Sequence, residues 1–242
     1  MSYIGPISIA AGSRIVGPAG ASGPPAGPNC VLLLHMDGSN GSTTFTDSSG
    51  LGHVVTNSPP VTVDTATVKF GTGSSFFTVG HALALDGSTD FSFGTADFTI
   101  DFWVNSSAGT CGFATTYQDG NVNNPAQWTL FQYGSQIFFR INVVSGVGDI
   151  NSGSTLFPTT GWHHIAYVRS AGVVTIYLDG TAVGSGACTS NFVNGPNSPV
   201  IGPPALANSG IPGFSGNMDE FRILNGRAAW VANFTPPTTP YT

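Results

Sequence analysis

Two aspartates at the ends of predicted strands are the residues best suited to binding a hard cation. Asp37 follows His35 on one face of the first predicted strand. Asp219 alternates with Phe221 and Ile223, so it is predicted to point inward, where an isolated carboxylate is costly. Carboxylate oxygens suit Ca²⁺. The alternative is that Asp219 accepts backbone hydrogen bonds and caps a turn, and the sequence leaves both possibilities open.

Aromatic and amide side chains gather in and after residues 105–127, which are predicted, like 185–216, to form a long Gly/Asn/Pro-rich loop. Aromatic faces stack on sugar C–H groups, and amides hydrogen-bond sugar hydroxyls. The alternative is that the tryptophans, Trp128 and Trp230, are core or interface residues. The predicted glycan-binding residues are Tyr117, Asn121, Asn123, Trp128 and Tyr133.

The residues needed for catalysis are missing. Glycoside hydrolases of jelly-roll architecture use two carboxylates on either side of the scissile bond, but this chain has a single Glu, Glu220, and no strand with two acids on one face. There is no nucleophile elbow, phosphate-binding loop or zinc-protease motif. His163 and His164 are adjacent, so on a strand they point to opposite faces. The sequence therefore predicts a protein that is not an enzyme.

Composition excludes two classes of partner. Charged residues make up 7% of the chain, with a net charge of −6 and one lysine, so there is no basic face for nucleic acid. No apolar run approaches the ~18 residues of a membrane span, which argues against membrane insertion. Three cysteines occur without metal-binding spacing, and whether Cys111 and Cys188 pair is left open.

The pattern of apolar residues predicts an all-β fold. Residues 31–36 form a nearly continuous apolar run, and apolar and polar residues alternate along 98–104 and 137–143. Residues 162–169 and 173–183 alternate as well, and Asp179-Gly180 is typical of the type I′ turn of a hairpin. Long helical periodicity is absent. We expect an antiparallel β-sandwich over residues 31–242.

Residues 1–30 differ from the rest and are predicted to be an extended Gly/Pro-rich arm. Three Gly-X-Y triplets begin at Gly17, too few for a stable collagen helix, so the tract is either a stiff spacer or a short contact between three chains. Apolar residues ahead of it have no domain of their own to bury them. We therefore expect residues 1–30 to act as an anchor that also holds an oligomer together, with a homotrimer favoured. The contacts would be made by Tyr3, Ile4, Ile7 and Ile9.

Four stretches, in the expected order, resemble the laminin-G-like, concanavalin A-like jelly-roll family. They are Lys69-Phe-Gly-Thr-Gly-Ser-Ser, Asp97-Phe-Thr-Ile-Asp-Phe-Trp-Val, Gly161-Trp-His-His-Ile-Ala-Tyr-Val-Arg running into Ile176-Tyr-Leu-Asp-Gly, and Phe214-Ser-Gly-Asn-Met-Asp-Glu-Phe-Arg-Ile. The resemblance implies a jelly roll from Val31 to about Pro236. It also implies a structural Ca²⁺ that ties the first strand to the last, at Asp37, Asp47 and Asp219.

The C-terminal segment Arg222-Ile-Leu-Asn-Gly-Arg-Ala-Ala-Trp-Val-Ala-Asn-Phe-Thr-Pro-Pro resembles the end of laminin-G-like domains in bacteriophage virion proteins. This implies a virion protein, a tail fibre, appendage or capsid decoration. It would be assembled in the host cytoplasm, attached to other virion proteins and exposed on the particle, where it binds a host-surface glycan for attachment. The alternative is a secreted or cell-surface carbohydrate-binding module, although the N-terminus makes a poor signal peptide. A glycan-active enzyme ranks third.

Overall fold

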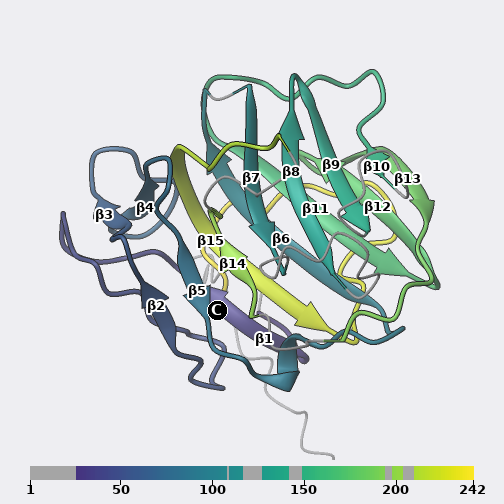
Figure 1. Ribbon diagram of the computed structural model, residues 1–242, viewed down its shortest axis with the longest axis horizontal. Helices are drawn as coiled ribbons and strands as arrows, with labels where there is room; N and C mark the ends of the chain where they lie inside the picture. The colour runs from purple at the N-terminus through teal and green to yellow at the C-terminus, as the bar shows by residue number, and fades with distance from the viewer. Residues whose placement is uncertain (1–25, 108, 117–126, 142–148, 194–197, 204–209) are drawn as a thin grey trace, which may run out of the picture.

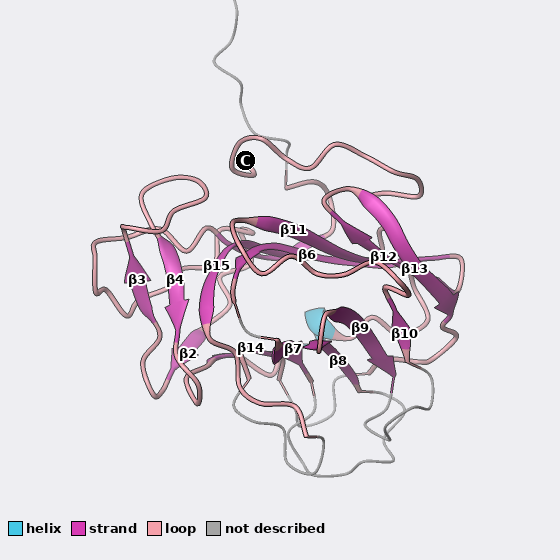
Figure 2. Ribbon diagram, turned by 90° about the horizontal axis from the view of Figure 1, so that it is seen from above, coloured by secondary structure: helices cyan, strands magenta, loops and turns pink. Residues whose placement is uncertain are grey.

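The computed structural model describes residues 26–107, 109–116, 127–141, 149–193, 198–203 and 210–242. Within these residues the chain forms two stacked antiparallel sheets and one short 3-10 helix, η1 (Thr89–Phe91). Figure 1 labels the strands, and Figure 2 shows the two layers from the side. The predicted all-β antiparallel jelly-roll sandwich is confirmed. The anchor residues Tyr3, Ile4, Ile7 and Ile9 lie outside the described residues.

Sheet A is built around the longest strand, β15, which pairs with β6 along most of its length. The order is β13-β12-β11-β6-β15-β4-β3, and β1 pairs with the C-terminal half of β15. Its described strands are β1 (Cys30–Leu34), β3 (Thr62–Asp64), β4 (Ser74–Phe77), β6 (Phe98–Asn105), β11 (His163–Ser170), β12 (Val173–Leu178), β13 (Thr181–Ala187) and β15 (Gly216–Asn225).

Sheet B lies against the other side of the core, in the order β10-β9-β8-β7-β14-β5-β2. Its described strands are β2 (Val55–Asn57), β5 (Leu83–Leu85), β7 (Thr110–Thr115), β8 (Trp128–Tyr133), β9 (Gln136–Ile141), β10 (Ile150–Asn151) and β14 (Val200–Ile201). Strands β7 and β14 fall inside the stretches 105–127 and 185–216, so the prediction that these are loops throughout is wrong.

The core lies between the inner faces of the two sheets and is rich in phenylalanine. Phe98 and Phe102 of β6 face Phe139 and Phe113 of sheet B, with ring centroids 5.8 and 5.5 Å apart. Fully burying one such side chain stabilises the fold by about 1.5–3 kcal/mol, so this layer needs no covalent support. Cys111 and Cys188 do not pair and lie buried as free thiols.

Two successive hairpins form the β11–β12–β13 half of sheet A. Asp179 and Gly180 have φ of +49° and +77°, the two positive angles of the predicted type I′ turn. His163 and His164 point to opposite faces, as predicted: His163 Nδ1 contacts Asp179 at 2.7 Å, whereas His164 contacts Asp101 on the outer face. The hairpin prediction is confirmed because it depended only on local alternation and turn chemistry.

A β-bulge in β15 moves Asp219 to the outer face of sheet A. The register with β6 shifts between Asp219 and Arg222, and Glu220 at the bulge has φ of +52°. Asp219 lies opposite Trp103 on β6, whereas Phe221 is in the core. Because a bulge adds one residue and shifts the alternation of side chains, the prediction that Asp219 shares a face with Phe221 is wrong.

The C-terminal segment 226–242, which we call the strap, crosses the outer face of sheet A (Figure 2). Trp230 and Phe234 stack at 3.9 Å with an interplanar angle of 6°. Together they pack on outward-facing residues of β11 and β12: Ala166, Val168 and Tyr177. Ala26 N donates to the carbonyl of Thr242 at 2.6 Å, so the start of the described chain meets its end beside the strap.

The strap seals a buried charged network. The carboxylate of Asp101 accepts from Arg222 Nε at 2.9 Å, contacts His164 Nε2 at 3.2 Å and accepts from the hydroxyl of Tyr241. Although burial opposes ionisation, the Arg222 charge and these hydrogen bonds hold the pKa of Asp101 below its usual value. A buried charge of this kind is tolerated only while its partners stay in place. Among the described residues, there is no helix long and apolar enough to cross a bilayer.

Candidate functional site

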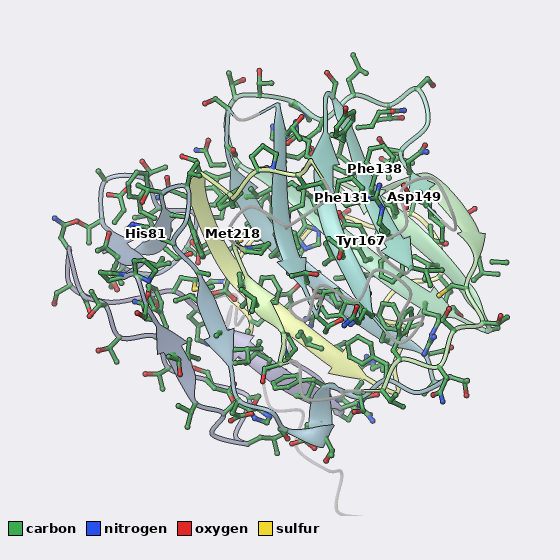
Figure 3. The ribbon with its side chains drawn as sticks, in the orientation of Figure 1. His81, Phe131, Phe138, Asp149, Tyr167 and Met218 are labelled. Atoms are coloured by element: carbon green, nitrogen blue, oxygen red, sulfur yellow. The ribbon has the colours of Figure 1, made fainter. Side chains whose placement is uncertain are left out.

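The outer face of sheet B carries aromatic side chains along β8 and β9. Alternation on β8 sends Trp128 into the core and Phe131 and Tyr133 outward. Phe131 lies opposite Phe138 of β9, and their rings stack at 4.7 Å and 11° (Figure 3). Tyr133 ends the strand opposite Gln136 and is 58% exposed. Phe131 is 1% exposed, so Tyr133 and the half-buried Phe138 supply the open ring surface.

An ion pair completes this surface. Arg140 Nε and Nη2 donate to the two carboxylate oxygens of Asp149, both at 2.8 Å. The guanidinium lies 4.5 Å from the ring centroid of Phe131 and is 6% exposed. We call Phe131, Tyr133, Phe138, Arg140 and Asp149 the aromatic face.

The chemistry of the aromatic face suits an uncharged ligand. Arg140 and Asp149 neutralise each other in a bidentate pair, so together they add no net charge. Half-buried Phe138 and exposed Tyr133 present ring surface, and Gln136 beside Tyr133 supplies an amide. Ring faces with neighbouring polar groups match the alternating C–H and hydroxyl surface of a sugar.

Of the five predicted glycan-binding residues, only Tyr133 is described and exposed. Tyr117, Asn121 and Asn123 lie outside the described residues. Trp128 is 1% exposed and its ring lies 6.1 Å from that of Phe93, nearly parallel to it, in the core. The prediction that Trp128 binds sugar is therefore wrong, because strand alternation places this residue on the inner face. Trp230 is part of the strap.

The sequence prediction missed four members of the aromatic face, Phe131, Phe138, Arg140 and Asp149. A signal for two of them was present: the alternation along 137–143 already placed Phe138 and Arg140 on the solvent side. A phenylalanine that faces outward beside an arginine is unusual on a polar sheet surface. Asp149 gave no signal, because its pairing with Arg140 depends on how the chain returns to β10.

The family of the chain is shown by the match between its sequence and a family profile. The profile of the concanavalin A-like lectin/glucanases superfamily matches residues 77–229, from the end of β4 into the strap. The chain belongs to this superfamily. The laminin-G-like resemblance is confirmed, and the matched range contains the whole aromatic face. No curated protein sequence matches the chain.

Solved structures with a similar fold include toxin binding domains and one domain of an extracellular arabinanase. The binding domain of Paraclostridial Mosquitocidal Protein 1 has a TM-score of 0.62 at 16% identity, covering 84% of this chain and 50% of that one. The botulinum neurotoxin serotype G binding domain has a TM-score of 0.60 at 17% identity, covering 84% and 49%. This chain therefore spans about half the length of these toxin domains, and the likeness is one of fold.

A third structure is covered over most of its length. Domain 4 of AbnA, a GH43 extracellular arabinanase from Geobacillus stearothermophilus, was solved in complex with arabinotriose. It has a TM-score of 0.55 at 18% identity, covering 76% of this chain and 88% of that one. At this identity the comparison again shows the fold alone.

Asp219, one of the three predicted calcium ligands, is held by backbone amides. Its Oδ2 accepts from the backbone N–H groups of Lys69 and Phe70 at 3.1 and 3.0 Å, and its Oδ1 accepts from that of Glu220 at 2.9 Å. Burial, together with the charge of Glu220, raises the pKa of Asp219 to about 8. The residue joins β15 to the loop before β4.

The same loop holds Asp37. Asp37 Oδ1 accepts from the backbone N–H groups of Thr72 and Gly73, the latter at 3.1 Å. A Cβ at Gly71 would lie 2.3 Å from this oxygen, so only glycine allows the close approach. Backbone N–H groups of residues 69–73 thus donate to two carboxylates. One follows the first strand and the other belongs to the last.

The third predicted ligand, Asp47, is also fully engaged. Its carboxylate accepts from the backbone N–H groups of Leu33, Ser49 and His53, at 3.1, 2.9 and 3.0 Å.

Backbone amides are the partners that the structure gives these three carboxylates. Ca²⁺ needs several oxygens turned toward one point. Here N–H donors, which repel a cation, point at the carboxylates. Across the part of the chain that the structure describes, no three His, Cys, Asp or Glu residues are placed to hold a metal ion. The arrangement matches the hydrogen-bonded alternative for Asp219, and calcium binding stays a prediction that these residues do not support.

Proposed function

We propose that the chain is a glycan-recognition module that binds sugar through the aromatic face of sheet B. The observation that carries the proposal is the open ring of Tyr133 next to the stacked Phe131–Phe138 pair, on the outer face of a sheet. A sugar ring lies against Tyr133 and Phe138, while Gln136 and the polar edge of the Arg140–Asp149 pair meet its hydroxyls.

Fold similarity supports a role in binding. A domain of the same fold was solved in complex with arabinotriose, and the likeness covers most of that domain. Binding without hydrolysis is proposed because the single Glu is occupied elsewhere. Glu220 contacts His35 Nδ1 at 2.7 Å and accepts from Tyr241 N at 2.9 Å, buried beneath the strap. A carboxyl in this position does not reach a glycosidic bond.

A glycan array tests this function. The full chain, biotinylated and clustered on streptavidin, is applied to immobilised host-envelope polysaccharides and defined oligosaccharides, because clustering raises avidity by about 10²–10⁴. Wild-type protein binds a subset of the array, and Tyr133→Ala loses at least tenfold of this signal. Val231→Ala, which truncates a side chain that is exposed on the strap, binds as wild type does. Equal binding by Tyr133→Ala and wild type contradicts the assignment, and an array without signal contradicts the function.

We propose further that a bacteriophage particle displays this module, as a tail fibre, an appendage or a capsid decoration protein. The resemblance of the C-terminal segment supports this role, and so does the position of the chain entry. Ala26 meets Thr242 on the sheet A side, so the first described residue lies on the other side of the sandwich from the aromatic face. An arm attached to other virion proteins there leaves the aromatic face free for a host glycan.

Sizing tests the part of this proposal that concerns the arm. The full chain and a truncated chain starting at Ala26 are compared by multi-angle light scattering. The full chain is expected to be a trimer and the truncated chain a monomer, because the apolar arm residues associate when three copies are present. Monomers from both chains at high concentration contradict self-association through the arm and leave attachment to a different virion protein as the anchor's role.

A further inference from the structure

A shallow hollow of about 320 Å³ lies at the β3–β4 end of sheet A. In Figure 1 this end is on the opposite side of the sandwich from β9 and β10. The volume is at the small end of the range for ligand sites, about 300–1,000 Å³. We call it the edge hollow, and it is lined by Asn40, Gly41, Thr62, Val63, Asp64 and Phe76.

Phe76 gives the edge hollow an open aromatic wall. On β4 it lies opposite Thr62 of β3 on one side and Asn217 of β15 on the other, on the outer face of the sheet. It is 40% exposed, whereas its neighbour Phe77 is buried in the core. The strap packs on β11 and β12 and contributes no lining residue, so this part of the outer face stays accessible.

Polar side chains beside the ring are held in fixed positions. Asp64 accepts from Ala66 N at 2.8 Å and from Asn217 Nδ2 at 3.1 Å, and Asn217 Nδ2 also donates to Ser74 Oγ at 2.9 Å. The hydrogen bond from Ala66 holds the pKa of Asp64 below its usual value, so the carboxylate is an acceptor at neutral pH. Asn40 contributes an amide. A ring wall with a pre-oriented acceptor is the arrangement that fixes a sugar.

The free edge of β3 is closed to a peptide strand. Gly41 N donates to the carbonyl of Val63, and Val63 N donates to that of Ser42, both at 2.8 Å. These bonds use the backbone groups that an added strand needs. A ligand must therefore be recognised by the side chains of the hollow.

We infer that the edge hollow is a second saccharide site, which takes one terminal sugar of a neutral glycan. The sugar stacks on Phe76 and donates hydroxyl hydrogen bonds to Asp64. The inference rests on the proposed glycan function but uses a different sheet and different residues. One chain then contacts a glycan-covered surface at two separate points, which raises avidity without making either site strong.

Amide-resolved NMR of the full ¹⁵N-labelled chain tests the two sites separately. The probes are arabinotriose, lactose, chitotriose, methyl α-glucoside and methyl α-galactoside, each to about 50 mM, since single sites of this kind bind weakly with Kd at the millimolar end. Shifts are expected in β3 and β4 as well as in β8 and β9. Phe76→Ala weakens the β3–β4 response at least tenfold and leaves the β8–β9 response unchanged. Phe76→Tyr retains both responses. Val79→Ala, an exposed neighbour beyond β4, serves as the matched control and changes neither.

The other outcomes contradict one or both of the site assignments. Shifts confined to β8 and β9 overturn the edge hollow and leave the proposed function intact, whereas shifts confined to β3 and β4 overturn the aromatic face. No shift with any probe overturns both. N-acetyl-lysine methylamide is titrated in parallel because a cation also fits a carboxylate beside an aromatic ring. If it shifts β3 and β4 where the sugars do not, the ligand is a basic peptide and the saccharide inference is wrong.

Discussion

Trp128 and Tyr133 lie at the two ends of β8 and differ completely in exposure, so they separate folding from binding. Trp128→Ala is expected to lower the free energy of unfolding by about 3–5 kcal/mol, because it empties a packed site in the core. Tyr133→Ala removes an exposed ring, so its cost is within about 0.5 kcal/mol while glycan binding is lost. Urea denaturation of both variants checks this. Comparable destabilisation by the two substitutions contradicts the assignment of Tyr133 to an open surface.

Asp219 makes the stability of the protein depend on pH in an unusual direction. Its pKa in the folded state is about 8, against about 3.9 for an unfolded aspartate. Between about pH 4 and pH 8 the folded state therefore holds a proton that the unfolded chain has released. The contribution of Asp219 to the free energy of unfolding is complete below pH 4 and falls as the pH rises through this window. The free energy of unfolding of wild type, relative to that of Asp219→Asn, is therefore expected to fall as the pH rises from 4 to 8.

Asp47→Asn is the matched control, with the opposite sign. Although burial opposes ionisation of Asp47, hydrogen bonds from Ser49, Leu33 and His53 hold its pKa below the usual value. Its contribution is present above about pH 4 and is lost on acidification. Thermal denaturation of both variants between pH 3 and pH 9, with and without EDTA, separates the two slopes. Parallel slopes contradict the account of Asp219, and a Tm that EDTA lowers supports the calcium prediction against the hydrogen-bonded arrangement.

At the scale of single residues, the sequence predicted exposure only where alternation is regular. It placed Phe98 and Ile137 correctly in the core, because their strands run without interruption. It placed Asp219 on the wrong face, because a bulge at Glu220 follows from how β15 meets two different neighbours, β4 and β1. That pairing depends on segments far away in the sequence, so no local pattern indicates the bulge.

Two hairpin turns of sheet A provide a controlled test of the strap. Ala171-Gly172 and Asp179-Gly180 both have two positive φ angles, and both glycines have φ of +77°. A Cβ at Gly172 meets only Thr189 Cγ2, at 3.8 Å, whereas a Cβ at Gly180 would lie 1.9 Å from the carbonyl oxygen of Phe234 in the strap. Backbone strain is therefore equal at the two positions, and contact with the strap is not.

Gly172→Ala is expected to cost about 1–2 kcal/mol, the strain of a side chain in the left-handed region. Gly180→Ala is expected to cost several-fold more, because the strap must move away and uncover the network around Asp101. Hydrogen exchange checks the cause: the amides of β11 and β12 lose protection in Gly180→Ala and keep it in Gly172→Ala. Equal costs and equal exchange contradict the sealing role of the strap.

Among the strands and turns, local sequence signals predicted the hairpins. Elements that depend on close packing between distant segments were not predicted. Strand β7 was predicted as part of a loop because residues 105–127 are rich in Gly, Asn and Pro. A Cβ at Gly112 of this strand would lie 2.8 Å from Pro203 Cγ, so the glycine serves packing against another segment. The C-terminal segment resembles virion domains in sequence, but no local pattern predicts that it packs on sheet A. The contact between Tyr241 and Asp101 joins residues far apart in the sequence.

In the molecule as a whole, the two outer faces of the sandwich carry different features. The strap and the entry of the chain take up much of the outer face of sheet A, and the aromatic face lies on sheet B. Charged residues make up only 7% of the chain, and the self-neutralised Arg140–Asp149 pair adds no net charge to the aromatic face. Composition did not identify the surface, because Tyr133 and Phe138 come together only after β8 and β9 pair.

The most direct test of the central claim is a crystal structure of the full chain with the oligosaccharide that binds best on the array. Electron density is expected for a sugar ring stacked on Tyr133 and Phe138, with hydroxyls near Gln136 and the Arg140–Asp149 pair. Density for sugar over the strap, or an empty aromatic face in crystals where that face is free of neighbouring molecules, would contradict it.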